Sequence, residues 1–264
     1  VSWGLAMVDS SHAGKVIAWV GTAMFAALVF SGPLGTMLFA AHGFAAIGLM
    51  TALLPLALLL VLLRAPNPPR VSVRTKSTLR DVIGAVWLPG LGAALSSIGY
   101  CAILAFSSLL YADHGWRPVW LAFTAFGAAL IVARLIFGHL PDKLGGAKIA
   151  SVFVLVQSAG LTLMGFARDA VTASAGAALA GLGYSLVYPG LGVEAVRGTS
   201  AENRGLAMGI YTVFLDIAMA VGSPALGWIA DPHGLNAVFL VSAAVTLCTT
   251  AVALHLAYEV HQTR

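Results

Sequence analysis

Apolar residues occur along this chain in eight long runs, and most of these runs contain no charged residue. Because a hydrocarbon core of about 30 Å requires about 20 apolar residues of helix, each run is long enough, or nearly so, to cross a membrane. Arg134 and Asp216 are the charged residues inside the runs. The pattern predicts an all-α integral membrane protein whose eight transmembrane helices cover residues 16–39, 43–63, 82–110, 118–140, 149–167, 170–193, 205–230 and 235–254.

The composition supports a membrane protein. Hydrophobic residues make up 59% of the 264 residues and charged residues 9%, whereas about a quarter of a typical soluble domain is charged. The 29 glycines fit the same interpretation, because helices in lipid associate through close packing, which small residues permit. Cys101 and Cys248 have no second cysteine nearby in the sequence, so we expect packing residues rather than a redox pair or a zinc site.

Basic residues are distributed unevenly between alternate loops. If residue 1 lies in the cytoplasm, eleven Lys or Arg residues lie in inner parts and two, Arg117 and Arg168, in outer loops. This bias predicts a multi-pass protein of the inner (plasma) membrane with both termini in the cytoplasm. It also explains the net charge of +4 without a nucleic-acid partner. The eleven inner residues are Lys15, Arg64, Arg70, Arg74, Lys76, Arg80, Lys143, Lys148, Arg197, Arg204 and Arg264.

Two sequence signals recur at a constant spacing. Gly14 and Gly205 mark the starts of the first and seventh runs, and Pro33 and Pro224 lie inside these runs, 191 residues apart in each case. Because transporters are often built from repeated halves, the spacing suggests that the eight spans correspond to helices 5–12 of a 6+6 two-bundle fold. Since the chain begins with Val1 and no signal peptide, we expect four helices to precede it. An eight-helix protein that is complete as it stands is the alternative.

The longest polar stretch, residues 64–81, contains three prolines and five basic residues and predicts a boundary between two bundles. Residues 1–64 are then the last two helices of an N-terminal half, and 65–81 a basic cytoplasmic linker. Residues 82–258 form a complete six-helix C-terminal half, followed by a cytoplasmic tail, 259–264. We expect the linker to be a solvated loop, and binding of anionic lipid headgroups is the alternative.

Residues 134–148 read RLIFGHLPDKLGGAK and contain the most specific motif of the chain. The stretch resembles the signature loop of the major facilitator superfamily, G-x-x-x-D-[RK]-x-G-[RK]-[RK], through Gly138, Asp142, Lys143 and Gly145. The next two residues, a glycine and an alanine, depart from the family's basic pair, and a lysine follows them. The resemblance implies solute transport by six plus six helices, with this loop between the eighth and ninth. Residues 181–216 are also similar to arabinose-efflux-like or drug-efflux-like bacterial permeases, which names no substrate.

The chemistry of this loop can be argued from its residues. Gly138 permits two helices to approach, and the carboxylate of Asp142 can accept hydrogen bonds from a helix N-terminus or pair with a cation. We expect Asp142 to meet the start of the first span near Gly14 and Lys15 and to hold the two halves in one state. A static cap is the alternative. Arg134 is expected to pair with Asp142 or to extend toward the membrane surface.

A carboxylate lies in the middle of the seventh span. Asp216 is eleven residues beyond Gly205, or roughly 16 Å along a helix. Because a charge at this depth is costly unless it is protonated, paired or hydrated, we expect Asp216 to bind a proton or a cationic part of a solute. A protonated aspartate that is hydrogen-bonded to a neighbouring helix is the alternative.

Other polar or helix-bending residues occur in the spans. Gly32 and Pro33 supply the Gly-Pro pair of the family's antiporter motif, whose other glycines are mostly absent, and Pro224 is expected to bend the seventh span. Glu194 and Arg197 predict a local ion pair with a gating role. Five side chains are candidates for lining a solute cavity, although each can also be a packing residue: Tyr100, Gln157, Tyr184, Tyr188 and Tyr211.

These features predict secondary active transport of a small organic solute by alternating access, coupled to protons through Asp216, with efflux as one direction. The expected partners are the solute, protons and the lipid bilayer, and the full-length protein is expected to be a monomer. No GxxxxGK[ST] loop for ATP and no HExxH set occurs in the sequence, so neither a cofactor nor an enzyme is expected. A fragment that transports nothing, or less favourably a membrane-embedded enzyme, is the alternative.

Overall fold

A computed structural model of the protein describes residues 13–64, 79–197, 199 and 203–262. All regular elements in these ranges are helices. They are α2 (Ala13–Leu63), α3 (Leu79–Asp113), α4 (Leu121–Phe137), α5 (Leu140–Leu144), α6 (Gly146–Gly165), α7 (Ala170–Arg197), α8 (Arg204–His233) and α9 (Leu235–Gln262).

Six of the described helices are long and apolar enough to cross a membrane. The predicted fold class, an all-helical membrane protein, is thereby confirmed in its general form. The predicted number of eight spans is not, because six helices are long and apolar enough and α4, with 17 residues, is shorter than a typical span. Helix α4 covers residues 121–137 of the predicted span 118–140, since Gly138 ends it.

The first two predicted spans both lie within α2, which is interrupted at Gly43. This residue has φ 72° and ψ −172°, a conformation that glycine adopts without steric cost because it has no Cβ. Near the predicted bend, the hydroxyl of Thr36 donates to the carbonyl oxygens of Gly32 and Pro33, each at 3.0 Å. The polar groups around this proline are therefore satisfied within the helix itself.

The chain divides into two compact units, Val1–Ser72 and Val73–Arg264. The division falls within the predicted linker 65–81, most of which lies outside the described residues. In the described part, the first unit consists of α2 and the second contains the helices from α3 to α9. The domain boundaries drawn from the sequence stay predictions.

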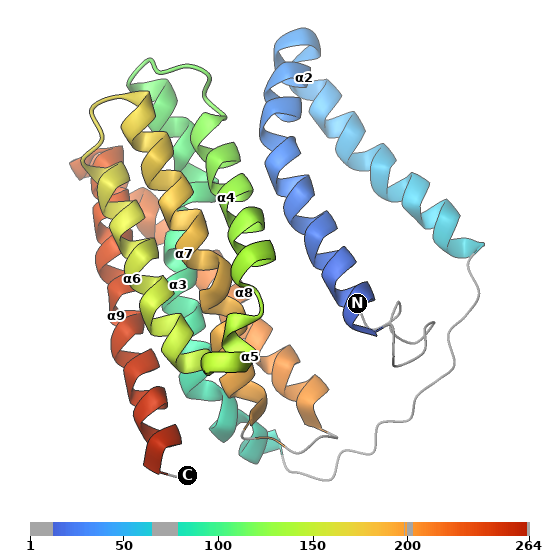
Figure 1. Cartoon of the computed structure of the whole chain (residues 1–264). Helices are drawn as coiled ribbons and strands as arrows, with labels where there is room; N and C mark the ends of the chain where they lie inside the picture. Colours follow the sequence, from blue (N-terminus) through green and yellow to red (C-terminus); the bar gives the residue numbers. More distant parts are fainter. Residues whose placement is uncertain (1–12, 65–78, 198, 200–202, 263–264) are drawn as a thin grey trace. The chain divides into compact units, whose positions relative to one another are not determined.

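Helices α3 and α7 form the centre of the second unit, where they contact each other. Helix α7 also packs against α6 and α4, α3 packs against α9 and α8, and α6 packs against α9. Figure 1 shows the long helices of this unit running side by side in one bundle. Helices α6 and α9 therefore form one side of the unit, while α4 and α8 flank the central pair.

Helices α6 and α7 approach each other backbone to backbone. A Cβ added to Gly183 on α7 would lie 2.6 Å from the carbonyl oxygen of Phe153 and 2.6 Å from the Cα of Gln157, both on α6. Such an approach is possible only where no side chain intervenes. We refer to these contacts as the glycine seam, which consists of Gly146, Gly160, Gly176, Gly183 and Gly190.

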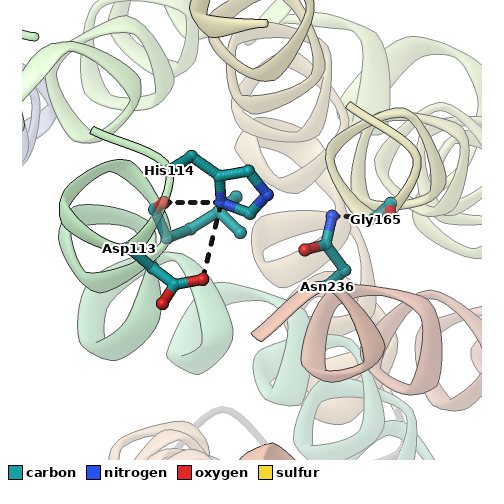
Figure 2. A network of polar contacts seen from close by, with 5 residues as sticks. Asp113, His114, Gly165 and Asn236 are labelled. Atoms are coloured by element: carbon teal, nitrogen blue, oxygen red, sulfur yellow. Dashed lines mark hydrogen bonds and ion pairs between the residues drawn. The ribbon is translucent and has the colours of Figure 1, made fainter. Parts of the chain in front are cut away.

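At the end of the unit where α6 leads into α7, side chains satisfy carbonyl oxygens near helix ends. Nδ2 of Asn236 donates to the carbonyl oxygen of Gly165 at 3.1 Å. Nδ1 of His114 lies 3.1 Å from the carbonyl oxygen of Leu110 and 3.7 Å from Oδ2 of Asp113. Figure 2 shows both groups of contacts. The last carbonyls of a helix lack regular helical partners, and Asn236 supplies one for Gly165, while His114 lies beside a carbonyl that already accepts its own backbone N–H.

Asp169 caps the start of α7. Its two carboxylate oxygens accept hydrogen bonds from the backbone N–H of Thr172 at 2.8 Å and from the Thr172 hydroxyl at 2.7 Å. These bonds, the backbone one foremost, hold the pKa of the Asp169 carboxyl below its usual value. The folded protein therefore stabilises the charged form of Asp169 more than the unfolded chain does.

The glycine seam generates a stability prediction. We expect Gly183→Ala to destabilise the protein by about 1–3 kcal/mol, because the new methyl group would overlap with the backbone of α6. Gly84→Ala in α3 is the matched control, since an added Cβ there has nothing within 4 Å. The measurement is thermal unfolding of both variants in detergent, and a Tm of Gly183→Ala equal to or above that of Gly84→Ala would contradict the tight seam.

The cap of α7 generates a pH prediction. Because the folded pKa of Asp169 is lowered, its contribution to stability is fully present above the unfolded pKa of about 3.9 and is lost as the pH falls through the lower folded value. We expect Asp169→Ala to lower the Tm at pH 6 and the difference from the unsubstituted protein to shrink below about pH 4. Asp231→Ala, at an exposed aspartate of α8, is the control, and a difference independent of pH would argue against the cap.

Candidate functional site

The residues of the signature loop form the connection between α4 and α6. Helix α4 ends at Gly138, whose N–H donates to the carbonyl oxygen of Arg134 at 2.9 Å. The short helix α5 follows and contains Asp142 and Lys143. Gly145 then ends α5 with φ 94°, a conformation that favours glycine. The spacing of the two motif glycines thus corresponds to the ends of two helices, with α6 starting immediately afterwards.

Glu194 of α7 connects this loop to the centre of the unit. Its carboxylate is 4% exposed, and Oε1 accepts a hydrogen bond from the backbone N–H of Ala147 at 3.0 Å. Oε2 accepts a hydrogen bond from Nη1 of Arg197 at 2.6 Å. The N–H of Ala147 belongs to the first turn of α6, where it has no partner within the helix. Glu194 therefore caps α6 from the neighbouring helix and is balanced by the charge of Arg197.

The sequence interpretation included the ion pair of Glu194 and Arg197 but not the contact with Ala147. These residues are 47 positions apart, and no spacing rule connects them. The sequence feature that could have indicated this contact is that Gly146 and Ala147 occupy the two positions where the family's motif has basic residues. At this point a Cβ on Gly146 would overlap with the backbone of Gly190, so small residues permit α7 to bring its carboxylate to the start of α6.

The latch predicted for Asp142 involves side chains that the structure does not describe. The side chains of Asp142 and Lys15 and the surroundings of Gly14 are outside the described set, so the latch and the pairing of Asp142 with Arg134 stay predictions. Arg134 itself is half-buried near the end of α4.

Three of the five candidate cavity residues direct their polar atoms into the second unit. Gln157 is fully buried, with its Oε1 accepting a bond from the hydroxyl of Ser96 at 2.7 Å and its Nε2 donating to the carbonyl oxygen of Ser96 at 2.9 Å. Tyr184 is buried, with its hydroxyl 3.3 Å from that of Ser97. Tyr211 is fully buried and donates to the carbonyl oxygen of Tyr188 at 2.7 Å. These bonds link α3 with α6 and α7, and α7 with α8.

The other two candidates are half-buried. The ring of Tyr100 on α3 stacks on that of Tyr184, with ring centroids 4.8 Å apart and an interplanar angle of 6°. The hydroxyl of Tyr188 lies 3.3 Å from that of Thr212 on α8. Tyr100 and Tyr188 are therefore the tyrosines of this set with ring surface available outside the packed interior.

Asp216 is exposed on α8, one helical turn beyond Thr212. Its neighbours Val213 and Ile217 are 50% and 57% exposed. Pro224 lies further along the same helix, which continues through it to His233. The carboxylate thus lies among apolar side chains in the middle of a helix long enough to cross a membrane.

In the described part of the chain, no three His, Cys, Asp or Glu side chains group as metal ligands would. Cys101 is buried, with its Sγ 2.9 Å from the hydroxyl of Ser223, and Cys248 is exposed and unpaired with another cysteine. Cys101 thus contributes to the packing of α3 against α8.

Comparison with known proteins gives consistent matches. Residues 91–263 match the sequence pattern of the Major Facilitator Superfamily. The chain is 38% identical over 262 residues to the Uncharacterized MFS-type transporter STM4428 of Salmonella typhimurium, a match that covers 99% of this chain and 67% of that protein. It is 36% identical over 242 residues to the Uncharacterized MFS-type transporter YhhS of Escherichia coli K12, covering 91% of this chain and 59% of that protein. The chain therefore spans only part of the length of these relatives.

The cap formed by Glu194 generates a third prediction. We expect Glu194→Ala to destabilise the protein by about 1–3 kcal/mol, because it leaves the buried N–H of Ala147 without a partner. Arg197→Ala should cost no more than about 1 kcal/mol, since the side chain of Arg197 is 43% exposed. Thermal unfolding in detergent measures both, and equal losses would mean that the ion pair, not the cap, carries the effect.

Proposed function

Because this chain belongs to the major facilitator superfamily, a family of membrane transporters and not of enzymes, we propose that it acts in secondary active transport of a small organic solute by alternating access. The family membership rests on the match over residues 91–263 and on the relative that is 38% identical. The solute, the coupling to protons and the direction are our proposals. Efflux is one direction, supported by the partial antiporter motif at Gly32 and Pro33.

The observation that carries the proposal is the exposed carboxylate of Asp216 in the middle of α8. A charge at the centre of a transmembrane helix costs several kcal/mol unless it is protonated or faces a partner or water. Asp216 is 12 residues from the start of α8 and 17 from its end, or about 18 Å and 26 Å along the axis. We propose that this carboxylate binds and releases a proton, or binds a cationic part of the solute, during each transport cycle.

We further propose that the contact between the signature loop and Glu194 keeps the inner end of the second unit rigid, so that it moves as one piece. Support comes from the hydrogen bond between Ala147 and Glu194 and from the ion pair with Arg197. In this proposal the loop end is cytoplasmic and the protein lies in the inner membrane, as the distribution of basic residues indicates. The spacing of 191 residues supports a correspondence of the spans with helices 5–12 of the 6+6 fold.

Asp216→Asn tests the proposal directly. We expect proton movement driven by a transported solute to fall by at least about tenfold, because the amide cannot carry a proton between the two sides of the membrane. The measurement is the internal pH of proteoliposomes that contain the 264-residue chain, followed with a trapped dye.

Asp231→Asn is the matched control. It makes the same change at an exposed aspartate near the end of the same helix and should leave coupling unchanged. Undiminished coupling in Asp216→Asn would contradict the role of Asp216. No transport by the unsubstituted 264-residue chain would favour the alternative that this chain alone transports nothing.

A further inference from the structure

The ring of Tyr100 rests on a support that is fixed from several sides. Tyr184 beneath it is 7% exposed, and its hydroxyl lies 3.3 Å from that of Ser97, which in turn donates to the carbonyl oxygen of Ala93 at 2.6 Å. Phe126 of α4 is fully buried, with its ring centroid 5.8 Å from that of Tyr100 and 6.4 Å from that of Tyr184. Three rings from three helices therefore form one rigid cluster, which we call the aromatic platform.

One face of Tyr100 remains uncovered by these rings. Tyr184 lies 4.8 Å away in a nearly parallel plane and thus covers the first face. A ring stacked on the second face would lie about 9 Å from Tyr184, given the usual separation of stacked rings. Phe126 is only 6.4 Å from Tyr184, so it lies beside the stack and not on the second face. The second face of Tyr100 thus has neither of these rings on it, and the residue as a whole is half-buried.

The hydroxyl group distinguishes Tyr100 from the other tyrosines that are buried or half-buried in this unit. The hydroxyls of Tyr111, Tyr184, Tyr188 and Tyr211 each have a hydrogen-bond partner. Within the residues that the structure describes, the hydroxyl of Tyr100 has none. This hydroxyl is also not one of the fully buried polar atoms that lack a partner, so it is accessible to water or to a bound solute.

The partners of Tyr100 place the aromatic platform on one side of α3. The partners of Tyr100 lie on α7 and α4, so the ring occupies the side of α3 away from α9 and α6. On that side α3 and α4 are both packed on α7. The aromatic platform therefore lies where α3, α4 and α7 meet.

The geometry points to Tyr100 as a stacking surface for a solute that contains a flat, conjugated ring. This inference rests on the proposed transport function and specifies the class of solute. A flat ring can extend the parallel stack of Tyr100 and Tyr184, and offset-stacked aromatic pairs contribute free energy beyond the burial of their surface. A puckered saturated ring of the same size loses that contribution.

Two probes of equal charge and similar size test the inference: 2-naphthylmethylammonium and its saturated counterpart, decahydro-2-naphthylmethylammonium. Because the charge is the same, an effect of Asp216 cancels in the ratio of the two affinities. Calorimetric titration of the purified protein in detergent should give a roughly 3- to 10-fold lower Kd for the flat probe.

Three variants locate the effect. Tyr100→Leu should abolish the preference for the flat probe, whereas Tyr100→Phe, which keeps the ring, should retain it. Tyr258→Leu changes an exposed tyrosine of α9 and should behave as the unsubstituted protein. Thermal unfolding of each variant establishes that it is folded, and the comparison of the two probes on the unsubstituted protein does not depend on any variant.

Equal affinity for both probes, absence of binding of the flat probe, or a preference that survives in Tyr100→Leu would each overturn the inference. Its failure is separable from that of the proposed function. A protein that transports with proton coupling but does not prefer the flat probe contradicts only the platform. A protein that prefers the flat probe but shows no transport in the proteoliposome experiment contradicts only the transport proposal.

Discussion

The second unit depends on the backbone contact between α6 and α7. In lipid, helices gain little from excluding water and associate mainly through close packing and hydrogen bonds. The glycine seam brings the two backbones together along most of α6, from Gly146 at its start to Gly160 and beyond. Gln157 lies on the same stretch, opposite Gly183, and binds Ser96 of α3 through both its amide oxygen and its amide nitrogen. The seam thus fixes α6 and α7, and Gln157 attaches α3 to them.

The way in which polar side chains of this unit are hydrogen-bonded also follows from the lipid environment. Many hydroxyls in the helices donate to a carbonyl oxygen one turn earlier, as Ser97 does to Ala93 and Ser151 to Ala147. Such bonds satisfy the hydroxyl without a neighbouring helix. Other groups bond between helices, among them Glu194, Gln157 and Tyr211, and such bonds help to determine which helices are held together. Asp216 differs from them because it is exposed on α8 among apolar neighbours.

Hydropathy predicted the approximate extent of the membrane helices. The bilayer thickness sets the length of a span, and each span therefore requires a run of consecutive apolar residues. The motif around Gly138 and Gly145 likewise predicted a turn between two helices. What the sequence did not predict is contact between distant positions: the bond between Glu194 and Ala147, or the burial of Tyr184 and Tyr211. The sequence around a tyrosine in a span is the same whether its hydroxyl binds a solute or a neighbouring helix. The packing of α7 against α3 and α8 is therefore needed to show that Tyr100 and Tyr188 are half-buried while Tyr184 and Tyr211 are buried.

The glycine seam also limits which sequence changes this protein can accumulate. Residues on the outward faces of α6 and α9, such as Val152 and Leu247, are exposed and can be exchanged among apolar types because lipid fits around any of them. At Gly160 or Gly183 the neighbouring atoms belong to the main chain of another helix and cannot move aside for a larger side chain. During evolution, substitutions should therefore accumulate faster at the outward-facing residues of α6 and α9 than at the glycines of the seam.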